Sequence, residues 1–216
     1  MLALAVTLGK MFDCDYNDYM KVTKEQAARN RRAIVRAASK LFRKHGIDGI
    51  GVADIGKEAG LTHGALYAQF PSKEALATEA LTEALDRSYA QMLAFAEERD
   101  SPIGAYLDFF VSKPHRDDLS KGRGCAMTAS GSEIARQGRG LSQAFTAGFD
   151  RFARALESSE LDVPLASTPR QRALTIAAGA IGAVVVARAV AKADLALSDE
   201  ILEAARRVLG EVGGEQ

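Results

Sequence analysis

Residues 52–70, with the sequence VADIGKEAGLTHGALYAQF, constrain the fold more strongly than any other stretch of the chain. Gly60 stands at the left-handed stop position of a short apolar-periodic segment, and Thr62 is a good N-cap for the segment that follows. The pattern predicts two short helices joined by a tight glycine turn. Leu66 and Phe70, four residues apart, are the only side chains of the second helix suited to a core, so this helix must pack on others.

The preceding segment supplies such a helix. Thr23 and Gln26 have the spacing of a capping box, and His45 and Gly46 end the pattern. Between them, apolar residues recur at helical intervals: Ala27, Ile34, Ala38, Leu41 and Phe42. A fourth helix is expected from Lys73 into the nineties. Residues 21–70 are therefore expected to form a three-helix domain.

The rest of the chain also has helical signals. Further helices are predicted after Ser101–Pro102, over 125–137, over 141–156, after the capping box at Thr168, and after Ser198 as the last N-cap. The stretches 113–124 and 157–167 are expected to be a loop and a surface connection. Trp is absent and strand-like alternation is hard to find. We therefore expect an all-α fold of about nine to ten helices, with 71–216 as a second helical domain.

Charge is distributed unevenly along a chain whose formal net charge is zero. Residues 21–73 carry eleven bases and four acids, whereas both flanking parts are acidic. This pattern suggests a polyanion-binding module attached to another unit, although a solvated basic helix face would produce it too.

Neither cysteine, Cys14 or Cys125, belongs to a metal cluster or disulfide framework, so the chain is expected to be cytoplasmic. Residues 1–20 lack a basic start and are interpreted as a flexible N-terminal extension rather than a signal peptide. The longest uncharged run, 173–187, is too short to span a bilayer, so no membrane partner is expected. No cofactor is expected, because the motifs for one are missing.

The stretch from Val52 to Leu76 resembles the signature of the TetR/AcrR family of bacterial transcriptional repressors. The likeness lies in the Asp-Ile pair, the Ala-Gly turn, the Leu-Tyr pair, Phe70 and the closing Ser-Lys-Glu. Four positions depart from the family pattern: Gly51, Gly56, Ala65 and Ala68. The two glycines weaken the first helix, and the two alanines leave fewer side chains that can reach bases.

The resemblance implies a helix-turn-helix that binds a palindromic operator in double-stranded DNA as a homodimer. Carried over by position, Thr62, Tyr67 and Lys73 would hold phosphates. The positions expected to face base edges are His63, Gly64, Ala65 and Gln69. A hydroxyl or an ammonium group can hold a phosphate without reading sequence, whereas Gln can pair with adenine. A surface His63, a core Tyr67 and a solvated Lys73 are the structural alternatives.

The resemblance also implies that 71–216 bind a small effector, which the composition suggests is mostly apolar or aromatic. The expected lining residues are Met92, Tyr106, Phe109, Phe110, Cys125, Met127, Phe145 and Phe149. Each of them could equally be a plain core residue. Cys125 follows Lys121 and Arg123 near a predicted helix start, a setting that would lower its thiol pKa. A thiol-based redox or electrophile sensor is therefore an alternative.

The long apolar helix that follows Thr168 is expected to have two covered faces. One would fill its own domain, and the other, a stripe of small residues, would meet a second copy. The stripe consists of Ala178, Gly179, Gly182 and Val186. A fully internal helix is the alternative here. An enzyme is not expected, because no catalytic constellation is evident. A non-specific DNA-binding or scaffold protein stays open as a third class.

Overall fold

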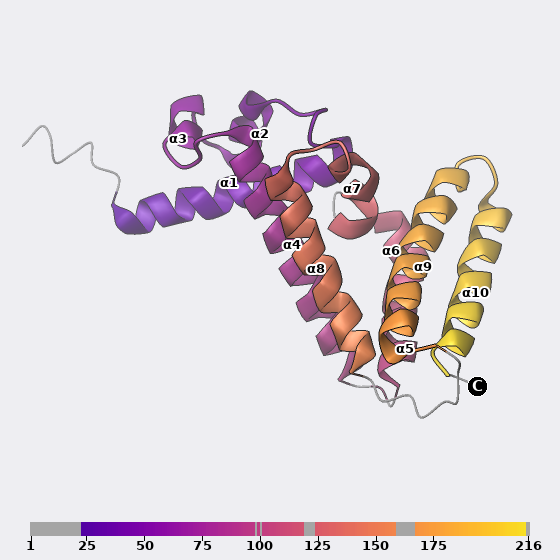
Figure 1. Cartoon of the computed structure of the whole chain (residues 1–216). Helices are drawn as coiled ribbons and strands as arrows, with labels where there is room; N and C mark the ends of the chain where they lie inside the picture. The colour runs from indigo at the N-terminus through magenta and orange to yellow at the C-terminus, as the bar shows by residue number, and fades with distance from the viewer. Residues whose placement is uncertain (1–22, 98, 100, 119–123, 159–166, 215–216) are drawn as a thin grey trace, which may run out of the picture.

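The computed structural model describes residues 23–97, 99, 101–118, 124–158 and 167–214. Within these ranges the chain forms ten α-helices and no strand, which confirms the predicted all-α class (Figure 1). The helices are α1 (Lys24–His45), α2 (Val52–Ala59), α3 (His63–Tyr67), α4 (Lys73–Ala96), α5 (Pro102–Phe110), α6 (Lys113–Asp117), α7 (Ala126–Ile134), α8 (Arg139–Glu157), α9 (Pro169–Val190) and α10 (Leu195–Val212). The predicted extension over 1–20, with Cys14, lies outside the described residues.

The first three helices form a small unit at one end of the molecule (Figure 1). The Thr23 hydroxyl caps α1, and Gly60 ends α2 with a φ of 69°, a conformation that suits glycine. Ile55, Leu66 and Phe70 are buried together in the core of this unit. The helix starts predicted at Thr62 and Ser72 are also observed, because each side chain accepts a hydrogen bond from the backbone N–H three residues on.

The remaining helices form the larger part of the molecule. α4 and α8 pack side by side in its middle, and α9 and α10 form a pair at the far side (Figure 1). Gly148 of α8 lies so close to α4 that an added Cβ would come 2.6 Å from Leu85 Cδ1. Tyr106, Phe110 and Phe152 lie fully inside this core, with ring centroids 5.2–6.4 Å apart. Aromatic contacts thus join α5 to α8.

α9 begins as predicted, with the reciprocal capping box of Thr168 and Gln171. Among the described helices it is the one long and apolar enough, by length and composition, to cross a membrane. It packs against α8 and α10, and Ile176, Ala180 and Val184 are fully buried. These contacts are those of a core helix within a folded domain.

Two predicted boundaries were wrong. The stretch 113–124 was expected to be a loop, but residues 113–117 form α6, because Ser112 caps a turn that tolerates Pro114 near its start. The last helix was expected to begin after Ser198. It begins at Leu195 instead, because the Asp194 carboxylate accepts a hydrogen bond from the N–H of Leu197. Most of the predicted connection over 157–167 lies outside the described residues.

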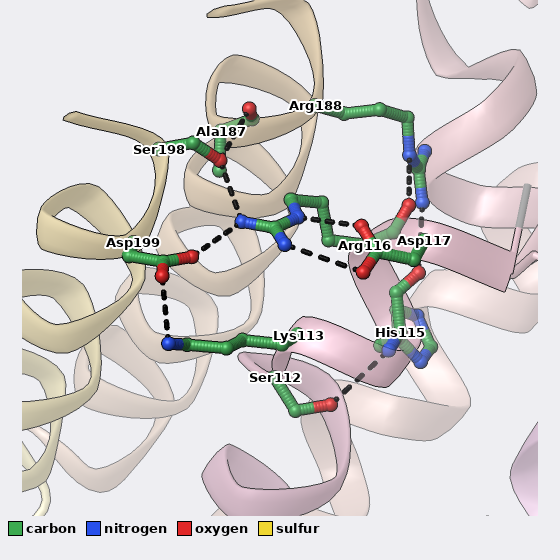
Figure 2. Close-up of polar contacts among 9 residues, drawn as sticks. All are labelled: Ser112, Lys113, His115, Arg116, Asp117, Ala187, Arg188, Ser198 and Asp199. Atoms are coloured by element: carbon green, nitrogen blue, oxygen red, sulfur yellow. Dashed lines mark hydrogen bonds and ion pairs between the residues drawn. The ribbon is translucent and has the colours of Figure 1, made fainter. Parts of the chain in front are cut away.

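Ser198 does not act as the predicted N-cap of the last helix but forms hydrogen bonds to α6 and α9. It is fully buried, and its hydroxyl donates to the Ala187 carbonyl of α9 at 2.8 Å and accepts from Arg116 Nη1 of α6 at 2.8 Å (Figure 2). Arg116 also pairs with Asp199, which in turn binds Lys113. These contacts lower the pKa of Asp199 and tie α6 to the α9–α10 pair.

Replacing Ser198 with Ala should lower the free energy of unfolding by about 1–3 kcal/mol, because the buried Arg116 guanidinium loses one of its acceptors. Urea unfolding measures the loss as a lower midpoint with an unchanged slope. Ser142, exposed on α8, provides the control substitution Ser142→Ala. Equal midpoints for the two variants would contradict a stabilising role for the Ser198 contacts.

Candidate nucleic-acid interface and effector pocket

The α2–turn–α3 segment is held by its own backbone. The N–H of Leu61 donates to the carbonyl of Gly56 at 2.9 Å, closing the turn around Gly60. Asp54 Oδ2 accepts from the N–H of Gly51, so a carboxylate three residues on compensates for the cap side chain that Gly51 lacks. Two helices joined by such a turn, with one short helix presented outward, define a helix-turn-helix.

The outward face of α3 consists of polar or small residues. Thr62, His63, Gly64 and Tyr67 are exposed, and nothing lies within 4 Å of the position that a Cβ of Gly64 would take. The rings of His63 and Tyr67 meet edge to face, with centroids 4.8 Å apart. Tyr67 is 48% exposed, so the alternative of a core role is wrong.

The other predicted residues lie at the edges of this face. Ala65, Gln69 and Lys73 are half-buried, the last in the first turn of α4. Six of the seven residues predicted to contact DNA therefore lie on α3 or within the turns that flank it, and Lys73 is the first residue of α4. α1, in the same unit, carries further exposed basic residues: Lys24, Arg29, Arg32, Arg36, Lys40 and Lys44. Such a surface has the charge and the groups that phosphates and base edges need.

α7 connects this unit to the rest of the chain. The Glu133 carboxylate near its end accepts from the backbone N–H groups of Ile47 at 2.6 Å and Asp48 at 3.0 Å. Gln137 Nε2, just after α7, donates to Asp48 Oδ2 at 2.9 Å. These hydrogen bonds fasten the turn between α1 and α2 to α7. No local sequence pattern indicates these hydrogen bonds, because their partners lie more than eighty positions apart.

A pocket of about 490 Å³ lies at the other end of α7. Residues of α4, α5 and α6 and the start of α7 line it: Ser88, Gln91, Phe95, Asp108, Phe109, Ser112, Pro114, His115, Asp118, Gly124 and Cys125. The rings of Phe95 and Phe109 are 5.5 Å apart and supply an aromatic wall. Asp108 is engaged by Arg206 of α10. An aromatic wall with a few polar groups beside it suits a small organic molecule.

The pocket contains only two of the eight predicted lining residues, Phe109 and Cys125. Four of the others are buried core residues instead: Met92, Tyr106, Phe110 and Met127. Phe145 and Phe149 of α8 are half-buried against the core, away from the residues that line the pocket. Apolar residue type alone does not separate core from pocket. The prediction rested on apolar residues, so it missed the polar residues that line the pocket, among them Gln91 and His115.

The expectation of a lowered pKa at Cys125 is wrong. The side chain is 3% exposed, and burial raises the pKa of the thiol. Lys121 and Arg123, on which the expectation rested, lie outside the described residues. A buried thiol with a raised pKa is a weak nucleophile at neutral pH, so the physical argument for thiol sensing no longer holds.

His115 is a second titratable group of the pocket with a perturbed pKa. Burial, together with the nearby Arg188 guanidinium, lowers its pKa from 6.5 to about 4. Its ring packs on Phe110, with centroids 4.5 Å apart, and its Nε2 atom has no hydrogen-bond partner. The imidazole is therefore neutral at physiological pH and can give or accept one hydrogen bond to a bound molecule.

The predicted dimer stripe lies partly on an open face. Ala178 and Gly182 of α9 are exposed, and Val186 is 49% exposed, so α9 is not fully internal. Val208 of the neighbouring helix α10 is also exposed, at 48%. Gly179 turns inward instead, since a Cβ there would come 2.8 Å from Leu209 Cδ2 of α10. Gly179 thus allows close packing within the chain.

Comparison with known families agrees with this geometry. Residues 34–80 match the model of the bacterial regulatory proteins, tetR family. The chain is 37% identical over 75 residues to the uncharacterized HTH-type transcriptional regulator YuxN of Bacillus subtilis, covering 35% of this chain and 26% of that protein. It is 36% identical over 84 residues to the HTH-type transcriptional regulator TtgR of Pseudomonas putida, covering 38% of this chain and 40% of that protein.

The matched residues thus span less than half of these relatives. The whole fold is similar to that of the TetR-family transcriptional regulator from Cytophaga hutchinsonii, with a TM-score of 0.72, 19% identity, and coverage of 86% of this chain and 96% of that one. The fold is also similar to that of the reduced form of E. coli NemR, with a TM-score of 0.69, 20% identity, and coverage of 85% of this chain and 97% of that one. Residues 34–80 thus match the tetR family of bacterial regulatory proteins, and the chain as a whole shares the fold of TetR-family transcriptional regulators.

Because the pKa of His115 is lowered in the native chain, the stability of the protein should depend on pH. Between pH 6.5 and 4 the unfolded chain binds a proton at this residue and the native chain does not, so stability falls as the pH falls. The shift corresponds to about 3 kcal/mol across this window. The free energy of unfolding of His115→Phe, followed by urea titration, should therefore depend less on pH than that of the original chain.

His45 is exposed at the end of α1, so His45→Gln controls for the replacement of an imidazole. If His115→Phe and the original chain lose stability in parallel from pH 6.5 to pH 4, the low pKa assigned to His115 is wrong.

Proposed function

We propose that the chain is a ligand-responsive transcriptional regulator, in the simplest case a repressor, that binds a palindromic DNA operator as a homodimer. A small, mostly apolar or aromatic effector would release it. The observation that carries the proposal is the division of α3 into two faces. Leu66 is fully buried, whereas the face with His63 and Tyr67 is open and polar.

The two faces support a division of labour in DNA binding. Thr62, Tyr67 and Lys73 would hold phosphates, and the Thr62 hydroxyl, which accepts the capping hydrogen bond, keeps its proton for this purpose. His63, Gly64, Ala65 and Gln69 would face base edges. Because Gly64 is open on its outer side, the backbone of α3 can come close to the DNA. In this proposal residues 21–70 are the DNA-binding domain and the chain acts in the cytoplasm.

A second copy of the chain would cover the open face of α9 and α10. Ala178, Gly182 and Val186 lie on it, and their small size permits close helix approach. A two-fold axis through this face would place two α3 helices on one duplex, which makes the operator palindromic. Residues 71–216 thus combine dimerisation with effector binding.

The effector would act through the pocket between α4, α5, α6 and α7. Because Cys125 at the start of α7 lines this pocket and Glu133 near its end holds the α1–α2 turn, α7 contacts both the pocket and the unit that contains α3. An effector that binds better when α7 is displaced shifts the protein towards a state with lower DNA affinity.

Selection from a pool of random DNA duplexes tests this function. The protein should enrich a palindromic sequence and bind it more tightly than a shuffled duplex at the same salt concentration. Equal affinity for the two duplexes would mean a non-specific DNA-binding protein, and no binding to either would remove the proposed function altogether.

Two substitutions test the division of labour on α3. Tyr67→Phe should weaken binding to the enriched and the shuffled duplex alike, by about 0.5–1.5 kcal/mol, because one phosphate hydrogen bond is lost. Gln69→Ala should relax the preference at one base pair by about 1–3 kcal/mol. Fluorescence anisotropy on duplexes with single base changes measures both. The same profile from both variants would contradict the assignment.

A further inference from the structure

Arg31 of α1 joins three elements at the base of α3. Its Nε donates to Glu79 Oε1 of α4 at 3.0 Å, and its Nη2 donates to Glu79 Oε2, which makes a two-pronged ion pair. Its Nη1 donates to the backbone carbonyl of Gln69 at 2.6 Å. The guanidinium also lies over the Phe70 ring, 4.2 Å from its centroid. One side chain thus binds α1, the end of α3 and α4 together.

α3 needs such a support because it is very short. Its five residues are far fewer than an isolated helix requires, so its position depends on packing. Leu66 and Phe70 anchor its buried side. The carbonyl of Gln69 lies just beyond the end of the helix, where carbonyls lack helical partners, and Arg31 supplies the donor.

We propose that Arg31, held by Glu79, is a positioning residue for sequence reading, because it fixes the backbone of Gln69, whose side chain faces the bases in the proposed function. A reading side chain must be placed to within about half an ångström, so a small shift of this carbonyl reduces discrimination between sequences. The inference rests on the proposed function and adds a residue that would not itself contact a base.

A simpler role for Arg31 is that of a positive charge near DNA, and the two roles predict effects of Glu79→Gln on different quantities. This change removes a negative charge, so electrostatics alone would raise the affinity for every duplex. If Arg31 positions Gln69, loss of its carboxylate partner lowers the preference for the enriched duplex. The ion pair is partly exposed, 41% and 40% for the two side chains, so its loss should leave the fold intact.

The chain contains a matched control. Lys40 of α1 and Glu58 of α2 form an ion pair with an Nζ–Oε1 distance of 2.6 Å and side-chain exposures of 52% and 38%. Glu58→Gln likewise removes one negative charge from an ion pair with α1, without touching Gln69 or Phe70. Any effect of charge alone is therefore shared by the two variants.

The experiment measures the ratio of dissociation constants for the shuffled and the enriched duplex at one salt concentration, with the full-length chain and a thermal melt of each variant. Glu79→Gln should lower this ratio about tenfold, or ~1.4 kcal/mol, whereas Glu58→Gln leaves it unchanged. Arg31→Lys keeps the charge but loses the fork, so it should give an intermediate ratio, and Arg31→Met the lowest one.

A ratio for Glu79→Gln that stays within about twofold of the original would overturn the inference. So would a full ratio for Arg31→Lys, since charge would then be sufficient. Failure of the unchanged protein to enrich any sequence overturns the proposed function instead, which keeps the two failures distinguishable.

Discussion

The packing of α4 against α1 is the constraint on which the rest of this structure depends. Ala77, Ala80 and Ala84 present small side chains to α1, so the two helices can approach closely around Phe42. α4 is one continuous helix of 24 residues, or roughly 36 Å. It begins at Lys73 beside α3 and lines the pocket near its other end with Gln91 and Phe95. A single helix therefore belongs to both the candidate DNA face and the candidate effector pocket.

Three sets of polar contacts hold other elements of the chain in place around the α1–α4 packing. Arg31 binds the end of α3, Glu133 binds the turn after α1, and Arg116 binds α6 to the α9–α10 pair. Each joins a side chain to elements far away in the sequence. In the proposed function, such contacts and the α4 packing are routes by which effector and DNA binding can be coupled, and that coupling acts equally in both directions.

The sequence predicted what local chemistry determines. Helix starts at Thr23, Thr62 and Thr168 were predictable because a capping side chain acts within three residues. The outward polar face of α3 was predictable because Leu66 and Phe70 alone could face the core. The start of α10 was mistaken, because Asp194 and Ser198 are both good caps and only the tertiary partner Arg116 decides the role of Ser198.

The pocket was less predictable, for a physical reason. Tyr106 and Phe110 are aromatic like Phe109, yet the first two are fully buried and only Phe109 reaches the pocket, a difference set by how α5 lies against α8. The low pKa of His115 and the raised pKa of Cys125 likewise come from burial, which neighbours in the sequence do not reveal. Contacts such as Arg31–Glu79 span 48 positions and leave no local pattern.

The most direct measurement of the central claim, that α3 reads DNA, is site-specific photo-crosslinking to the enriched duplex. A benzophenone side chain placed at Ala68, exposed just after α3, is compared with one at Ala204, exposed on α10. The account predicts a crosslink from position 68 to a defined nucleotide in each half of the palindrome and none from position 204. Crosslinks from position 204 with none from position 68 would contradict it.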